Sequence, residues 1–117
     1  MTQQELGLLG ENMATRYLKE LGHQILARNF HFGKLEVDIV SSFEDKIHFT
    51  EVKARQTAEI GEPWQAVTRG KQRQIIRVAD HYLKEKELDS EAQFNIASIV
   101  YNSFRKELMF IPDAFTT

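Results

Sequence analysis

The order in which hydrophobic spacing changes along the chain constrains its fold more than any other feature. Residues 3–21 repeat apolar side chains at helical spacing, and Thr2 and Glu5 form a capping box at their start, while Gly22 supplies a stop. The next three segments alternate apolar and polar residues, at positions 24–29, 35–40 and 46–54. The stretches that join them, at 30–33 and 42–45, are short enough to be hairpin connections. Three successive strands predict an antiparallel meander behind an N-terminal helix.

The second half of the chain predicts another helix and two more strands. Pro63 begins a short helical turn, and Thr68 can cap a helix that runs to about Leu88. Residues 94–101 and 107–111 then have the pattern of strands. A strand that follows such a helix can return parallel to the third strand by a right-handed crossover. We therefore expect an α/β fold with an α-β-β-β-α-β core and a mixed sheet flanked by helices.

The composition is that of one ordinary globular domain. The 117 residues contain no repeat, low-complexity tract or linker, so we expect a single domain over residues 1–117. The chain contains no cysteine, which excludes a disulfide scaffold, a thiolate zinc site and a cysteine nucleophile. No apolar run approaches the length of a membrane span, and the first residues do not resemble a signal peptide. We therefore expect a cytoplasmic protein without membrane contact.

Charge is unevenly distributed along the chain. The net charge is −2, which is the wrong sign for a protein that coats nucleic acid. Between positions 53 and 77, however, six Lys and Arg residues stand against two Glu. Such a segment is either a solvated helix face or a surface for phosphate, and composition leaves both open. The members that we expect to bind nucleic acid are Arg55, Arg69, Lys71, Arg73 and Arg77.

Two carboxylates fall in predicted strands, where a buried sheet disfavours charge. Alternation in the second strand places Val37 and Ile39 on one face and Asp38 on the other. Glu51, in the third strand, lies on the face of the apolar residues that precede it. If these strands form a hairpin, Asp38 lies across from the region of Glu51. Both carboxylates are then partly buried and need a cationic partner, which Lys53 can supply from the same face as Glu51.

These carboxylates indicate a candidate metal site. Carboxylate oxygens without cysteine or clustered histidine select Mg²⁺ or Mn²⁺ over zinc, so Asp38 and Glu51 are the expected ligands. The pattern Asp…Glu-x-Lys is weak by itself, because an exposed ion pair between Glu51 and Lys53 is the ordinary alternative. Glu11 stands beside Gly10 on the flank of the first helix's apolar stripe. It is either a further member of the site or an exposed helix glutamate.

Four segments give the pattern more specificity than any single motif. They are Gly10-Glu11-Asn-Met-Ala14, Ile25-Leu-Ala-Arg-Asn29, Glu36-Val-Asp38-Ile-Val40 and Phe49-Thr-Glu-Val-Lys-Ala-Arg55. With the order helix glutamate, strand aspartate and Glu-x-Lys on the next strand, the chain resembles the restriction-endonuclease-like superfamily, which includes archaeal Holliday-junction resolvases. Over essentially its whole length it resembles more closely the bacterial YraN family of inferred endonucleases.

The resemblance implies a metal-dependent endonuclease that hydrolyses phosphodiester bonds of DNA, with branched or junction DNA as the structure-specific substrate. DNA is expected rather than RNA, and a homodimer is expected by analogy with resolvases that cut two strands. The implied catalytic residues are Glu11, Asp38, Glu51 and Lys53, with Asp38 and Glu51 holding Mg²⁺ or Mn²⁺.

Two positions depart from the family's pattern. His31 stands where the family commonly has an arginine, and Asn95 where it commonly has an aspartate. Neither belongs to the Asp-Glu-Lys set, so the expected metal site is intact.

Two other functions are compatible with the sequence. The first is a nucleic-acid-binding module that keeps the nuclease-like fold without turnover, as the acidic balance and small size suggest. The second is a protein-interaction domain with Trp64 as an anchor, although tryptophan usually buries most of its surface and we expect Trp64 in the core.

Overall fold

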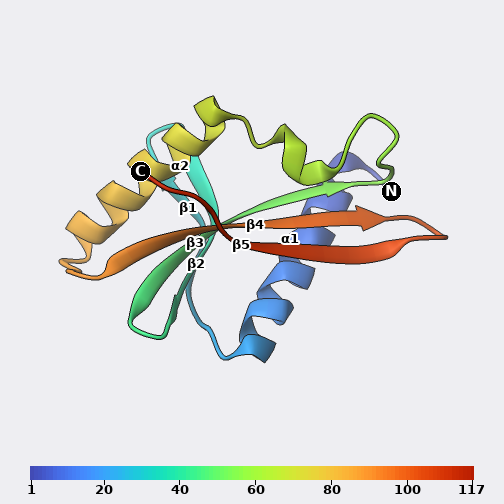
Figure 1. The fold of residues 1–117 in the computed structure, drawn as a ribbon. Coiled ribbons are helices and arrows are strands. Elements are labelled where there is room, and N and C mark those ends of the chain that lie inside the picture. Colours follow the sequence, from blue (N-terminus) through green and yellow to red (C-terminus); the bar gives the residue numbers. More distant parts are fainter.

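The computed structural model describes residues 1–117, and its helices and strands follow the predicted order (Figure 1). The helices are α1 (Gln3–Leu21), the short 3-10 helix η1 (Pro63–Ala66) and α2 (Arg69–Glu85). The strands are β1 (Gln24–Phe32), β2 (Leu35–Phe43), β3 (Lys46–Arg55), β4 (Glu91–Tyr101) and β5 (Lys106–Phe115). None of the helices has both the length and the apolar character needed to cross a membrane.

The five strands form one mixed sheet in the order β1-β2-β3-β4-β5. β3 and β4 run parallel, and every other neighbouring pair is antiparallel. The chain passes through η1 and α2 between the two parallel strands, so α2 belongs to the crossover. α1 covers one face of the sheet and α2 the other (Figure 1). The α/β class, the α-β-β-β-α-β core and the parallel return to the third strand are confirmed.

α1 has the ends that its sequence predicts. The Glu5 amide donates to Thr2 Oγ1 over 3.1 Å, and the Thr2 amide donates to Glu5 Oε1 over 2.8 Å, which completes the capping box. Gly22 closes the helix with φ of 108°, a left-handed conformation that favours glycine. In the middle of α1, a Cβ atom on Gly10 would lie 2.9 Å from the Ala54 Cβ. The missing side chain therefore lets α1 approach β3 closely.

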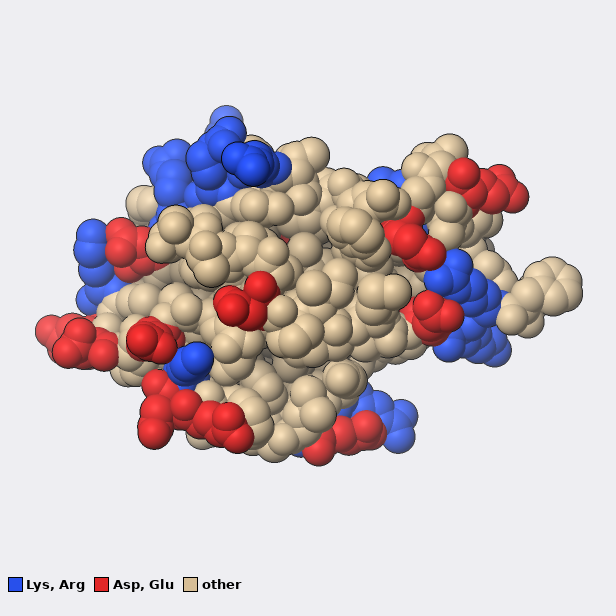
Figure 2. Space-filling model, in the orientation of Figure 1, with Lys and Arg blue, Asp and Glu red and all other residues tan.

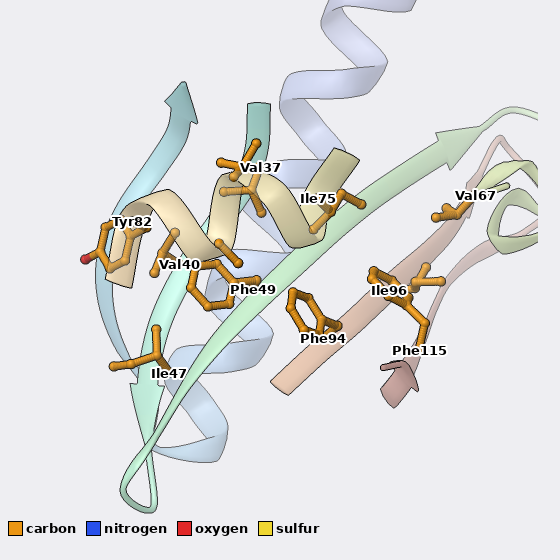
Figure 3. Close-up of a cluster of buried hydrophobic side chains, with 12 residues drawn as sticks. Val37, Val40, Ile47, Phe49, Val67, Ile75, Tyr82, Phe94, Ile96 and Phe115 are labelled. Atoms are coloured by element: carbon orange, nitrogen blue, oxygen red, sulfur yellow. The ribbon is translucent and has the colours of Figure 1, made fainter. Parts of the chain in front are cut away.

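The main core lies between α2 and the sheet (Figure 3). Its twelve buried residues include Phe49 and Phe94 from the sheet and Ile75 and Tyr82 from α2. A smaller cluster on the α1 side consists of Ala14, Leu18, Ile39 and Ala97. Both faces of the central strands are therefore buried, which agrees with the unbroken runs of buried residues in β3 and β4.

The alternation of β2 is interrupted at Asp38. Val37 and Val40 pack in the core on the α2 side, whereas Ile39 packs on the α1 side. The prediction that Val37 and Ile39 share a face was therefore wrong. Regular pairing of β2 with β3 ends at Ile39 and Thr50. The alternation of side chains between the two sheet faces is therefore not continuous across Asp38.

Some element bounds also differ from the prediction. β1 continues through Phe32, so most of the expected connection at 30–33 is strand and the turn begins at Gly33, where φ is 62°. α2 ends at Glu85 rather than near Leu88. β4 begins at Glu91 rather than at 94, and β5 extends to Phe115 rather than to 111. Backbone pairing sets these ends, and the pattern of apolar side chains does not reveal them.

Trp64 is not the core residue that the sequence predicts. Its amide donates to Ser98 Oγ over 3.0 Å, which holds η1 across β4. The residue keeps 39% of its surface exposed.

Candidate metal and nucleic-acid site

The candidate site forms where β2 and β3 separate. Their antiparallel register ends with Ile39 opposite Thr50, and one further step would place Asp38 opposite Glu51. In place of a backbone acceptor, the Val52 amide donates to Asp38 Oδ2 over 2.7 Å. The Asp38 side chain therefore occupies the gap that the end of the ladder leaves. The expected proximity of Asp38 and Glu51 follows from this register.

Glu51 is the most perturbed acid of this region. The residue is 4% exposed, and its Oε1 atom is buried without a hydrogen-bond partner. Its Oε2 atom lies 3.5 Å from Lys71 Nζ. Burial raises the pKa of Glu51 to about 8, and the charge of Asp38 adds to this rise, while Lys71 and Lys53 oppose it. One carboxylate oxygen of Glu51 therefore lies beside a lysine, whereas the other has no hydrogen-bond donor in the fold.

The donor set fits a hard divalent cation. The unpartnered Glu51 Oε1 and the neighbouring Asp38 carboxylate supply oxygen ligands, and a cation there would offset the burial of Glu51. No group of three or more His, Cys, Asp or Glu side chains is placed to hold a metal. Such an ion would therefore keep several waters, with the Val52 carbonyl as a further candidate ligand. Mg²⁺ commonly binds in this way, whereas zinc prefers a full set of protein ligands.

Lys71 takes a place that the sequence did not predict. We expected it to contact phosphate, and the structure places its ammonium group beside Glu51. Thr68 fixes this geometry, because its Oγ1 accepts the Lys71 amide over 3.2 Å in the first turn of α2. Lys53 is half-buried and lies two residues after Glu51 on β3, where its charge lowers the Glu51 pKa. The sequence did contain a signal for this position, because the Thr68 cap places Lys71 in the first turn of the helix that follows β3.

Glu11 belongs to a separate polar cluster. Its Oε1 atom accepts from Asn29 Nδ2 over 3.1 Å and from Arg28 Nη2 over 3.4 Å. It does not join Asp38 and Glu51 in a group of three acids. Arg28 Nε is itself buried without a partner, and Asn29 has a positive φ of 53°. Sequence reasoning gave these two residues no role, although they end the segment 25–29, which carries part of the family resemblance.

The basic segment forms an exposed surface on α2. Figure 2 shows Lys and Arg side chains gathered over the first part of this helix. None of the other predicted phosphate-binding residues makes an ion pair with a carboxylate, so their charges are free for a ligand. These residues are Arg55, which is half-buried at the end of β3, and the exposed Arg69, Arg73 and Arg77 of α2.

The two departures from the family's pattern have structural partners. His31 Nε2 lies 3.1 Å from Glu36 Oε2 across the β1–β2 pair. Asn95 is fully buried, and its amide group donates towards His48 Nδ1 and Thr50 Oγ1. Both residues therefore have local partners within the sheet.

One protein-family model matches the part of the chain that contains all of the site residues described above. The family model described as Uncharacterised protein family UPF0102 matches residues 10–99. A UPF0102 protein of Christiangramia forsetii is 37% identical over 111 residues, covering 95% of this chain and 93% of that relative. A UPF0102 protein of Geobacter metallireducens is 40% identical over 111 residues, covering 94% and 91%. One of Chloroherpeton thalassium is 32% identical over 125 residues, covering 99% and 97%.

Proposed function

The chain belongs to the UPF0102 family, also known as YraN, and we propose that it is a metal-dependent endonuclease acting on branched or junction DNA. The observation that carries the proposal is the pair of carboxylates at the split between β2 and β3. Glu51 Oε1 is buried without a partner there, beside Asp38. An uncompensated buried acid is costly to keep, and such acids are concentrated at functional sites.

Each residue of the site has a role in this proposal. Asp38 and Glu51 would hold Mg²⁺ or Mn²⁺, whose chemistry is to activate water and to polarise a phosphodiester. The Val52 amide fixes Asp38 Oδ2, and the Lys71 ammonium fixes Glu51 Oε2, so that Glu51 Oε1 remains available. Lys53 presents a cation on the same strand and offsets charge that develops on the phosphate.

The surface beside the site suits a DNA backbone. Arg69, Arg73 and Arg77 have no carboxylate partner and follow one side of α2 at intervals of four residues. Unpaired cations in a row contact phosphates without reading bases. The unpaired arginines of this surface lie on one helix of a chain whose net charge is −2, which favours recognition of DNA shape over a long footprint.

The proposal is tested by incubating the purified protein with branched, flapped and linear DNA in Mg²⁺ or Mn²⁺. We expect cleavage of at least one branched substrate that EDTA stops and that Glu51→Gln reduces by about two orders of magnitude or more. Glu87→Gln, which changes an exposed acid after α2, is the matched control and should cleave as the wild type does. Cleavage that persists in Glu51→Gln would show that another site or a contaminant is responsible.

A second candidate function is a DNA-binding module without turnover. The observation that favours it is Glu11, which is held by Arg28 and Asn29 and does not complete an acidic triad with Asp38 and Glu51. This module would bind DNA in a salt-dependent way, and binding would survive Glu51→Ala without any cleavage by the wild type. Metal-dependent cleavage that this substitution abolishes would exclude it.

A further inference from the structure

An apolar pocket of about 480 Å³ lies between η1, the start of α2 and the last two strands. Most of the residues that line it are hydrophobic, and the two exceptions are Gln65 of η1 and Gln72 of α2. Two large side chains that line the pocket stay partly in solvent, Trp64 at 39% exposure and Met109 at 41%. The residues that form its floor and walls include Trp64, Val67, Gln72, Ile96, Met109 and Ile111. Figure 2 shows an area without Lys or Arg over the middle of β4 and β5, which bear part of this pocket, while Lys and Arg side chains gather at the right-hand end of these strands.

The pocket adjoins the candidate cleavage site on the same face of the sheet. The Trp64 amide is bound to Ser98 Oγ, and Ser98 is the neighbour of Lys53 in the parallel β3–β4 ladder. On α2, Gln72 lines the pocket and directly follows Lys71, which contacts Glu51. The backbone at Trp64 and the start of α2 therefore place the pocket beside the part of β3 and β4 that carries Lys53 and next to Lys71.

We propose that this pocket stacks an unpaired base of a DNA strand whose phosphates lie along α2. The inference rests on the proposed function and names its substrate class, DNA with a single-stranded segment beside the cleaved phosphate. An aromatic side chain can stack on any base, but within a duplex the faces of each base are covered by its neighbours. Charge complementarity favours an anionic occupant, because Arg69 and Arg73, in the same first turns of α2 as the pocket residue Gln72, have no carboxylate partner.

Two acidic groups near the pocket are partly neutralised by an arginine. Glu62 precedes η1, and Glu107 lies in β5, and both share the guanidinium of Arg105 at 3.3 and 2.9 Å. This bridge neutralises part of their charge and ties η1 to β5. The pocket walls are therefore braced in place before any ligand binds.

The chain offers a direct reporter, because Trp64 is its only tryptophan. Indole fluorescence is followed in EDTA while a single-stranded oligothymidylate or a duplex of equal length is added, so that no cleavage takes place. We expect the single strand to quench Trp64 and the duplex to quench it much less. Trp64→Ala should weaken single-strand binding by about 5- to 150-fold, the range of one base–aromatic stack. Trp64→Phe should keep most of the affinity.

The matched control is Phe104→Ala, which removes an aromatic residue that is 99% exposed away from the pocket and should leave both affinities unchanged. Unquenched Trp64 at saturating single strand would overturn the inference, and this readout needs no variant to fold. The inference would also be overturned if Trp64→Ala bound the single strand as tightly as the wild type does. The same would hold if light scattering showed that Trp64 is required only to form a dimer. Branched DNA cleaved equally well by Trp64→Ala and the wild type would refute this inference and leave the nuclease proposal standing.

Discussion

Replacing Glu51 by glutamine should stabilise the metal-free protein, although it should abolish function. The pKa of Glu51 is about 8 in the fold, chiefly because the side chain is buried, against 4.5 for an ordinary glutamate. The folded state therefore binds a proton that the unfolded state has released, and stability falls as the pH rises from about 4.5 to 8. At about 1.4 kcal/mol per pKa unit, the shift sets a ceiling of about 5 kcal/mol on this loss of stability. Because a buried site relaxes when it becomes charged, we expect a loss between about 2 kcal/mol and that ceiling.

The assay is thermal or urea unfolding in EDTA at pH 5 and pH 8.5, for the wild type, Glu51→Gln and the control Glu87→Gln. Glutamine keeps the shape of the side chain and carries no charge, so Glu51→Gln should lose much less stability between the two pH values than the wild type. The difference at pH 8.5 should raise the melting temperature by about 6 °C or more. The reasoning would be refuted if Glu51→Gln were less stable than the wild type at pH 8.5, or if both lost stability equally with pH.

Three further predictions concern the fold and the DNA surface. Gly10→Val should destabilise the protein by about 1–3 kcal/mol in urea unfolding, because the added Cβ would lie 2.9 Å from the Ala54 Cβ. Gly7→Ala, with open space around its Cβ, should be neutral or stabilising. Equal effects of the two substitutions would contradict the close packing of α1 on β3. His23 is 7% exposed, and burial lowers its pKa to about 4, so stability should fall by about 1–3 kcal/mol as the pH drops from 6.5 to 4, and His23→Gln should flatten this part of the profile. Arg73→Gln should weaken DNA binding and reduce the slope of log affinity against log salt by about 1, and an unchanged slope would remove this residue from the phosphate contacts.

The elements whose signals are local were predictable from the sequence. Thr2 and Gly22 mark the ends of α1, and Thr68 marks the start of α2, because caps depend on residues within one turn. The proximity of Asp38 and Glu51 could also be predicted, because a hairpin with a short turn fixes the register of its strands up to the neighbouring pair, Ile39 and Thr50.

The remaining features depend on tertiary packing. The interruption of β2 at Asp38 arises because the β2–β3 ladder ends there, which no alternation of side chains reveals. Lys71 reaches Glu51 only because the crossover returns the start of α2 over β3. The sequence left Glu11 open between a member of the site and an exposed helix glutamate, whereas in the fold it accepts from Arg28 and Asn29, which the sequence reasoning left without a role.

The central claim, that Asp38 and Glu51 form a divalent cation site, is tested most directly by calorimetric titration with Mn²⁺. We expect the wild type and Glu87→Gln to bind one or more ions with the same affinity. Asp38→Asn and Glu51→Gln should each weaken the binding by about tenfold or more, because each removes one of only two carboxylate ligands. Equal Mn²⁺ binding by all four proteins, or no binding by the wild type, would contradict the account.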